Sequence, residues 1–268
     1  MSEPAPLTGK RIVITRAREV AGVLADALAA EGAEVVSIPT IEIRDPESWE
    51  PLDEAIRRLE EFDFLLVTSA NGVRKFLERL AVCGRGLDDL LGLEIGAIGP
   101  ATADEFARAG VKVDFIPREY RAEGLVEAFG DLDMSGKAFL IPRAKVARDL
   151  VPRMLAERGA RVDVVEAYET VLPSIAPAEL DRLLSPPPDW VTFTSSSTAA
   201  NFVALLGEHR AEQLLSAAAV ASIGPVTSAT LRGLGVPVAV EARVSTIPGL
   251  VDAIKQYVAR KRKQPATG

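Results

Sequence analysis

The stretch Asp63-Phe-Leu-Leu-Val-Thr-Ser-Ala-Asn-Gly72 decides the fold, because a second stretch repeats its pattern. That second stretch is Asp189-Trp-Val-Thr-Phe-Thr-Ser-Ser-Ser-Thr198. Each contains a continuous apolar run, which is typical of a strand buried on both faces of a parallel sheet. Each run ends in small hydroxyl residues, which commonly begin a helix. The two stretches therefore predict two strand–loop–helix units of the same kind.

The repetition continues on both sides of these stretches. The separation between matching residues drifts only from 127 (Gly9 to Gly136) to 125 (Gly124 to Gly249). A period this long is not that of a solenoid and indicates a duplicated domain. The further matches, in chain order, are 9–18 with 136–145, 31–33 with 158–160, 98–102 with 223–227, and 124–126 with 249–251.

Apolar runs alternate with helical patterns along the whole chain. The segment Val20–Ala30 predicts a helix, and Pro51 is placed to begin another. This alternation predicts an α/β fold of two doubly wound parallel-sheet domains, each with about five strands. The expected strands are 12–15, 35–38, 64–68, 95–98, 113–116, 139–141, 162–165, 191–194, 220–223 and 238–240.

Two joints in the chain have an unusual composition. Ser37–Arg44 and Val165–Pro173 are extended, proline-flanked segments at equivalent places in the repeat. A boundary near Asp133 would divide the chain into two consecutive halves. The equivalent joints allow another arrangement, in which the first strand–helix–strand segment belongs to the C-terminal domain.

The composition excludes several kinds of site. The chain of 268 residues is long enough for two domains, and its only cysteine and histidine are Cys83 and His209. An internal disulfide, a cysteine cage and a multi-histidine metal site are therefore excluded. We expect no metal site. His209 lies in a polar stretch and is expected to be exposed to solvent, so a triad built on it is not favoured.

Charge and hydropathy bear on partners and location. The net charge of −7 argues against nucleic acid as a partner, and four basic residues in 260–263 are expected to be a helix end. No apolar run approaches the length of a membrane span. The first residues lack the features of a signal peptide. We expect a cytoplasmic protein that does not associate with membranes.

Hydroxyl residues follow the predicted strands at positions where parallel sheets bind ligands. Helix N-termini there offer free N–H groups to carboxylates and phosphates. A single Thr-Ser pair would be an ordinary helix cap, but the cluster in 194–198 has more hydroxyls than a cap needs. Capping could still explain Thr102 and Thr227. The predicted substrate-binding residues in these loops are Thr68, Ser69, Asn71, Thr102, Ser195, Ser196, Ser197, Gly224 and Thr227.

Three further side chains are candidates for the chemistry. Arg16 and Arg143 are equivalent in the repeat and follow strands, where each could bind a carboxylate or remain an exposed loop charge. Tyr168 lies in a joint, and a phenol can donate a proton to a leaving hydroxyl. It could instead only pack there. No glycine-rich nucleotide-binding motif is present.

These motifs in this order resemble the uroporphyrinogen-III synthase family over residues 8–258. The segments that carry the resemblance are 9–16, 68–73, 98–102, 165–170, 194–197 and 223–227. Tyr168 matches the linker tyrosine of the family, and Thr102 and Thr227 match family threonines of the site. The sequence departs from the family pattern at Asn71, where some relatives carry arginine.

The resemblance implies two α/β domains joined by a two-stranded linker. The domains would be 1–38 with 172–268, and 42–168, with linker strands 37–44 and 165–173. The implied activity is a cofactor-free lyase reaction, in which hydroxymethylbilane loses water and closes to uroporphyrinogen III with ring D inverted. An azafulvene cation and a spiro intermediate are implied, with Tyr168 assisting departure of the hydroxyl. We expect a monomer, which could make transient contact with the preceding or following pathway enzyme.

Two other classes of function compete with this interpretation. A non-catalytic two-lobed module could bind an anionic small molecule with the same loops. An enzyme such as a sugar-phosphate isomerase is a second alternative, but such sites usually need a clear acid–base pair, and none is obvious in this chain.

Overall fold

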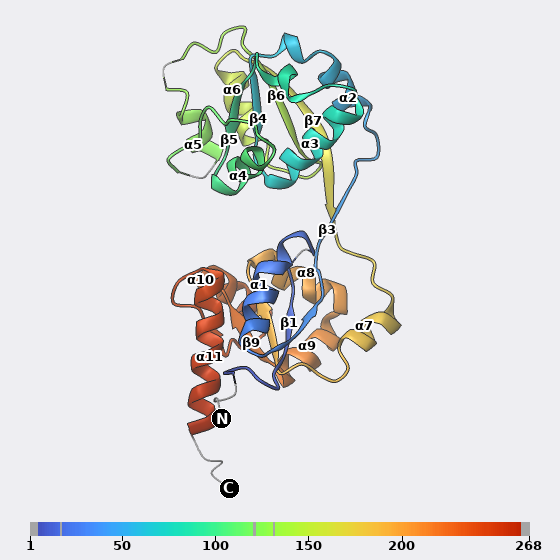
Figure 1. Ribbon diagram of the computed structural model, residues 1–268, viewed down its shortest axis with the longest axis vertical. Helices are drawn as coiled ribbons and strands as arrows, with labels where there is room; N and C mark the ends of the chain where they lie inside the picture. The colour runs from blue at the N-terminus through green and yellow to red at the C-terminus, as the bar shows by residue number, and fades with distance from the viewer. Residues whose placement is uncertain (1–4, 17, 120–121, 131, 264–268) are drawn as a thin grey trace. The chain divides into compact units, whose positions relative to one another are not determined.

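The computed structural model describes residues 5–16, 18–119, 122–130 and 132–263. The chain forms two compact α/β units (Figure 1). Unit 1 contains the described residues up to Glu42 together with those from Val171 onward, and unit 2 is Ile43–Thr170. The first strand–helix–strand segment therefore folds with the C-terminal part of the chain, and the chain passes between the units twice.

Unit 1 has a five-stranded sheet in the order β10-β9-β8-β1-β2. The apolar side chains of α1 and α11 pack on one face of this sheet, and those of α7 to α10 pack on the other. Its strands are β1 (Arg11–Ile14), β2 (Glu34–Ser37), β8 (Trp190–Phe193), β9 (Ala219–Ser222) and β10 (Val240–Glu241). Its helices are α1 (Arg18–Ala30), α7 (Pro177–Leu183), α8 (Ser196–Leu206), α9 (Glu208–Ala217), α10 (Pro225–Gly233) and α11 (Ile247–Lys263).

Unit 2 has a five-stranded sheet in the order β3-β7-β6-β4-β5. Helices α2 to α4 cover one face, and α5 and α6 cover the other. Its strands are β3 (Glu42–Arg44), β4 (Phe64–Val67), β5 (Glu94–Ala97), β6 (Ala138–Ala144) and β7 (Arg161–Val171). Its helices are α2 (Glu50–Arg57), α3 (Ala70–Val82), α4 (Pro100–Arg108), α5 (Ala122–Glu127) and α6 (Leu150–Glu157), with 3₁₀ turns at Leu59–Glu61 and Leu87–Leu90.

The two sheets share one topology, as the duplication predicts. The order β9-β8-β1-β2 in unit 1 corresponds to β5-β4-β6-β7 in unit 2, and these neighbours pair in parallel. An equivalent lysine–aspartate ion pair lies at the start of two neighbouring strands in each unit. Asp189 accepts from Lys10 Nζ (2.6 Å) and the Arg11 amide (2.9 Å), and Asp63 accepts from Lys137 Nζ (2.8 Å) and the Ala138 amide (2.9 Å). The prediction of two doubly wound domains is confirmed.

The predicted strand over 113–116 is wrong. Among these residues only Phe115 forms a bridge, with Gly96 of β5. The Phe115 ring lies so close to Gly96 that a Cβ there would stand 2.4 Å from it, and the Asp114 carboxylate accepts from the Ile95 amide at 2.8 Å. Backbone hydrogen bonds from the Asp114 amide to the Ile95 carbonyl (2.8 Å) and from the Ala97 amide to the Phe115 carbonyl (3.2 Å) also hold this segment beside β5, but the pairing is confined to one bridge. The fifth strand of the sheet is β3.

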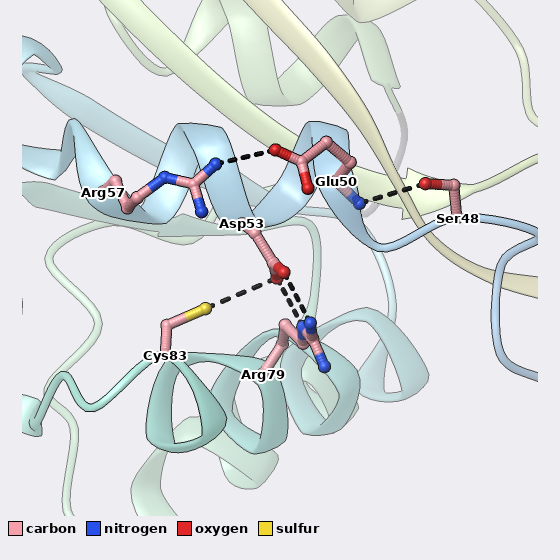
Figure 2. Close-up of polar contacts among 6 residues, drawn as sticks. All are labelled: Ser48, Glu50, Asp53, Arg57, Arg79 and Cys83. Atoms are coloured by element: carbon pink, nitrogen blue, oxygen red, sulfur yellow. Dashed lines mark hydrogen bonds and ion pairs between the residues drawn. The ribbon is translucent and has the colours of Figure 1, made fainter.

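An ion pair joins α2 to α3 at the end of α3 distant from its first turn (Figure 2). Both carboxylate oxygens of Asp53 accept from Arg79, whose guanidinium also lies 5.0 Å from the centre of the Trp49 ring. The Cys83 thiol contacts Asp53 at 3.4 Å, and burial raises the pKa of this thiol, with a further rise from Asp53. Cys83 is therefore a structural group rather than a thiolate nucleophile.

Candidate functional site

The loop after β4 joins a helix cap to a tyrosine. Ser69 is the N-cap of α3, and its Oγ accepts from the Gly72 amide at 3.0 Å. The same Oγ lies 2.9 Å from the hydroxyl oxygen of Tyr168. A Cβ at Gly72 would lie 3.0 Å from Val67 and 3.1 Å from Ser69 Oγ, so glycine lets the first turn of α3 approach closely. Two of the predicted site residues, Ser69 and Tyr168, are thus in direct contact.

A β-bulge sets the direction of Tyr168. The pairing of β6 with β7 runs Arg143 to Glu166 and then Ala144 to Tyr168, which leaves Ala167 as an extra residue. A bulge turns the following side chain away from the regular alternation. Ala167 and Tyr168 consequently pack in the same apolar cluster, and Tyr168 is only 7% exposed. The bulge is what brings the phenol to Ser69.

The hydrogen bonds around Ser69 allow the hydroxyl proton of Tyr168 to remain free for a ligand. Ser69 Oγ already accepts from the Gly72 amide, and either hydroxyl can donate in the contact with Tyr168. When Ser69 donates, the phenol keeps its own proton for a ligand. The pair can therefore act as a fixed hydrogen-bond donor or a general acid.

Asn71 lies beside a cation that the sequence analysis missed. Its Oδ1 accepts from the Arg74 guanidinium, one turn later on α3. Arg74 Nε is also 3.6 Å from Glu105 Oε1 on α4, which links α3 to α4. The i,i+3 spacing of Asn71 and Arg74 was a signal that could have identified this arginine. Thr68, at the start of the same loop, is partly exposed.

Thr102 and Thr227 are equivalent residues in the first turns of α4 and α10. Both are 4% exposed, and within the described residues neither hydroxyl makes a side-chain hydrogen bond. Capping therefore does not explain these two threonines. At Gly224, which precedes α10, a Cβ would lie 2.5 Å from Ser245 Oγ, so a larger residue there would force the Ser245 side chain to move. Each unit thus presents a buried threonine hydroxyl with capacity to bind another group.

The loop after β8 repeats the cap with different partners. Ser195 accepts from the Thr198 amide at 3.2 Å and contacts Ser197 Oγ at 3.0 Å. Ser196 Oγ donates to the Val226 carbonyl at 3.3 Å. This bond joins the first turns of α8 and α10, so the serine cluster and the Gly224–Thr227 loop form one group of donors in unit 1.

The equivalent arginines differ in their partners. Arg143 donates to the Arg148 carbonyl at 3.0 Å and forms an ion pair with Asp149. Arg16 Nε is buried and has no hydrogen-bond partner among the described residues, and burial lowers the pKa of Arg16. The repeat explains the difference, because Gly22 occupies the place of Asp149. In the part of unit 1 that the structure describes, Arg16 therefore has no counter-ion.

Comparison with known proteins identifies the family. The family model described as uroporphyrinogen-III synthase HemD matches residues 22–252. A uroporphyrinogen-III synthase from Synechococcus elongatus is 40% identical, covering 94% of this chain and 97% of its own length. The chain belongs to the uroporphyrinogen-III synthase family. A putative uroporphyrinogen-III synthase from Methanothermobacter thermautotrophicus is 33% identical, covering 91% of this chain and 96% of its own length.

Solved structures of uroporphyrinogen-III synthases have the same fold. A mutant uroporphyrinogen-III synthase from Thermus thermophilus aligns with a TM-score of 0.62 at 19% identity, over 94% of this chain and 100% of that one. The uroporphyrinogen-III synthetase from Helicobacter pylori gives 0.62 at 21% identity, over 92% and 99%. These likenesses support the two-domain α/β architecture.

Within the described residues, no group of three or more His, Cys, Asp or Glu side chains is placed to hold a metal ion. In that same part of the chain, no helix is both long and apolar enough to cross a membrane.

Proposed function

We propose that this chain is a uroporphyrinogen-III synthase that converts hydroxymethylbilane into uroporphyrinogen III. The substrate is a linear tetrapyrrole with an acetate and a propionate on each ring. A flexible polyanion needs many N–H and hydroxyl donors, and both units supply them at helix N-termini. The single observation that carries the proposal is the hydrogen bond between Tyr168 and Ser69, at 2.9 Å.

The residues have distinct roles in the proposed reaction. The phenol of Tyr168 protonates the hydroxyl on ring A, which leaves as water while the pyrrole nitrogen supplies the electron pair. The azafulvene cation is attacked by ring D through a spiro intermediate, and the macrocycle closes with ring D inverted. The proton lost on closure regenerates the phenol. The lyase step uses no cofactor or metal in this scheme, and positioning of the two ends of the substrate is the main task.

Carboxylate binding is assigned to the other predicted residues. Arg16 is the best-supported anion ligand, because its buried guanidinium lacks a partner within the described residues. Arg143 would contribute less, since Asp149 already neutralises it. The remaining proposed binding residues are Thr68, Ser69, Asn71, Thr102, Ser195, Ser196, Ser197, Gly224 and Thr227.

An isomer assay tests the proposed activity. The chain is supplied with freshly made hydroxymethylbilane, and the product is oxidised and separated into porphyrin isomers. We expect type III in excess of the spontaneous type I background, both before and after dialysis against a chelator. Type I alone would refute the activity and would favour the alternative, a non-catalytic two-lobed module that binds an anion. Loss of activity on dialysis would refute only cofactor independence.

The organisation of the protein in the cell is also a proposal. We infer a cytoplasmic monomer with domains 1–38 with 172–268 and 42–168, joined by linker strands 37–44 and 165–173. Sedimentation of the purified chain tests the monomer, and limited proteolysis tests the boundaries. Transient contact with the preceding or following enzyme would appear as faster transfer of hydroxymethylbilane in a coupled assay.

A further inference from the structure

A pocket of about 640 Å³ lies where β1, β8 and β9 of unit 1 begin. The loops of the candidate site lie at the other ends of these strands, so this pocket is separate from them. One wall is formed by Pro187 and Pro188, which precede β8. Tyr257, Lys261 and Arg262, in the last turns of α11, also line the pocket.

The lining of the pocket combines charged side chains with aromatic, proline and alanine side chains. Trp190, at its base, is 2% exposed, and the Tyr257 ring meets it edge-on at 5.2 Å between centroids. Lys261 Nζ lies 5.9 Å from the centre of the Tyr257 ring. Two prolines, an aromatic ring and short aliphatic side chains form a surface suited to a flat ring system.

The charge of the pocket is positive, although the chain carries a net charge of −7. Its lining contains three cations, Lys10, Lys261 and Arg262, and one carboxylate, Asp189. Asp189 is already paired with Lys10 at 2.6 Å. Within the described residues, Lys261 and Arg262 have no carboxylate partner. The cations at the end of the chain are therefore free to bind an anionic ligand.

The duplication supplies an internal control for this pocket. Unit 2 has the equivalent ion pair between Lys137 and Asp63, and its sheet has the same order. However, α5 ends at Glu127, whose equivalent is Asp252, whereas α11 continues to Lys263. The added turns carry Tyr257, Lys261 and Arg262. Tyr257 and Val258 also pack in the apolar cluster that covers Trp190, whereas the exposed Lys261 and Arg262 cover no core side chain, so the fold does not require these two cations.

We propose that this pocket is a second ligand site, which binds a flat aromatic molecule carrying at least two carboxylates. The ring lies against Tyr257 and the two prolines, and the carboxylates pair with Lys261 and Arg262. The basic end of α11 is then a recognition element rather than only a favourable helix terminus.

Single-tryptophan NMR tests the site directly. The Trp49→Phe chain keeps Trp190 as its one indole, whose N–H signal reports on the pocket floor. Naphthalene-2,6-dicarboxylate is the probe, and cyclohexane-1,4-dicarboxylate carries the same charges without a flat face. We expect a saturable shift of the Trp190 signal with the naphthalene probe and a much weaker one with the cyclohexane analogue. No saturable shift, or equal affinity for both compounds, would overturn the proposal.

Charge variants in the same background assign the binding to the helix end. Lys261→Gln with Arg262→Gln should weaken binding roughly tenfold, as expected for two exposed ion pairs. The matched control, Arg182→Gln with Arg232→Gln, removes the same charge from exposed positions elsewhere in unit 1. It should leave the affinity unchanged. Equal weakening in both double variants would show nonspecific attraction and refute the site.

Discussion

The loops after β4 and β8 have the same cap and different hydroxyl partners. Ser69 and Ser195 each accept from an amide in the first turn of the following helix. Ser69 then contacts Tyr168, whereas Ser195 contacts Ser197. The repeat places Ile41 where unit 2 has Tyr168, so unit 1 has no phenol at that position. The duplicated cap is therefore joined to a phenol in unit 2 and to a further serine in unit 1, and under the proposed function only unit 2 supplies an acid.

Removing the phenol tests this asymmetry with the largest expected effect. Tyr168→Phe should lower kcat about 100-fold, as for loss of a general acid, because the aromatic ring stays packed while the proton donor is lost. The Michaelis constant should change little. Initial rates of type III formation measure both values, and the thermal unfolding midpoint shows whether the core is retained. A kcat near that of the unaltered chain would remove Tyr168 from the mechanism.

The two equivalent arginines extend the comparison to substrate binding. Arg16→Gln should raise the Michaelis constant roughly tenfold, since a charge-assisted hydrogen bond contributes about 1.5–3 kcal/mol. Arg143→Gln is the matched variant, and its effect should be smaller because Asp149 and the Arg148 carbonyl already occupy Arg143. If the two variants raised the Michaelis constant equally, the missing counter-ion of Arg16 would have no effect on substrate binding.

The sequence predicted the features that depend on local pattern. Continuous apolar runs located the strands, and the drift of the repeat showed which loops correspond. The lack of a repeat-equivalent counter-ion for Arg16 was also open to prediction, because Gly22 stands where unit 2 has Asp149. The same apolar criterion failed at 113–116, where backbone pairing with β5 is limited to one bridge between Phe115 and Gly96.

The contact between Ser69 and Tyr168 was beyond sequence reasoning. The two residues are 99 positions apart, and their contact depends on the bulge at Ala167. The order of apolar and polar residues in this strand does not show where a one-residue bulge occurs. Arg74 was missed for another reason: it lies within α3, beyond the run of small hydroxyl residues that marks the loop, although its side chain bonds to Asn71 at the start of that helix.

Truncating the two caps separates catalysis from binding. Ser69→Ala should lower kcat about tenfold, because Tyr168 loses its hydroxyl partner. Ser195→Ala should instead raise the Michaelis constant about threefold, at an unchanged kcat. Both variants lose a cap, so each unit should be destabilised by about 1 kcal/mol. Steady-state rates and thermal unfolding measure these effects. Ser69→Thr, which keeps a hydroxyl and a cap, should restore kcat, and failure to do so would contradict the proposed contact.

The smallest expected effect concerns the ion pairs Lys10–Asp189 and Lys137–Asp63, which should make the free energy of unfolding depend on pH. Hydrogen bonds from Lys137 and Ala138 lower the pKa of Asp63 below the ordinary 3.8. Burial raises the pKa of Asp189, but the hydrogen bonds from Lys10 and the Arg11 amide together outweigh it, so this pKa is also lowered. The folded chain therefore binds fewer protons than the unfolded chain near these values. Its unfolding free energy should fall as the pH falls from 5 through the folded pKa values.

Neutral variants show how much of this pH dependence each unit carries. Asp63→Asn and Asp189→Asn should each cost about 1 kcal/mol at pH 7, because the pairs are partly exposed, and should flatten the decline below pH 4. Asp26→Asn, at an exposed position of α1, is the control and should leave the pH curve unchanged. Denaturant unfolding at pH 3 to 7 measures all three variants. If only one of the two pair variants flattens the curve, the duplicated ion pair stabilises one unit and is merely inherited in the other.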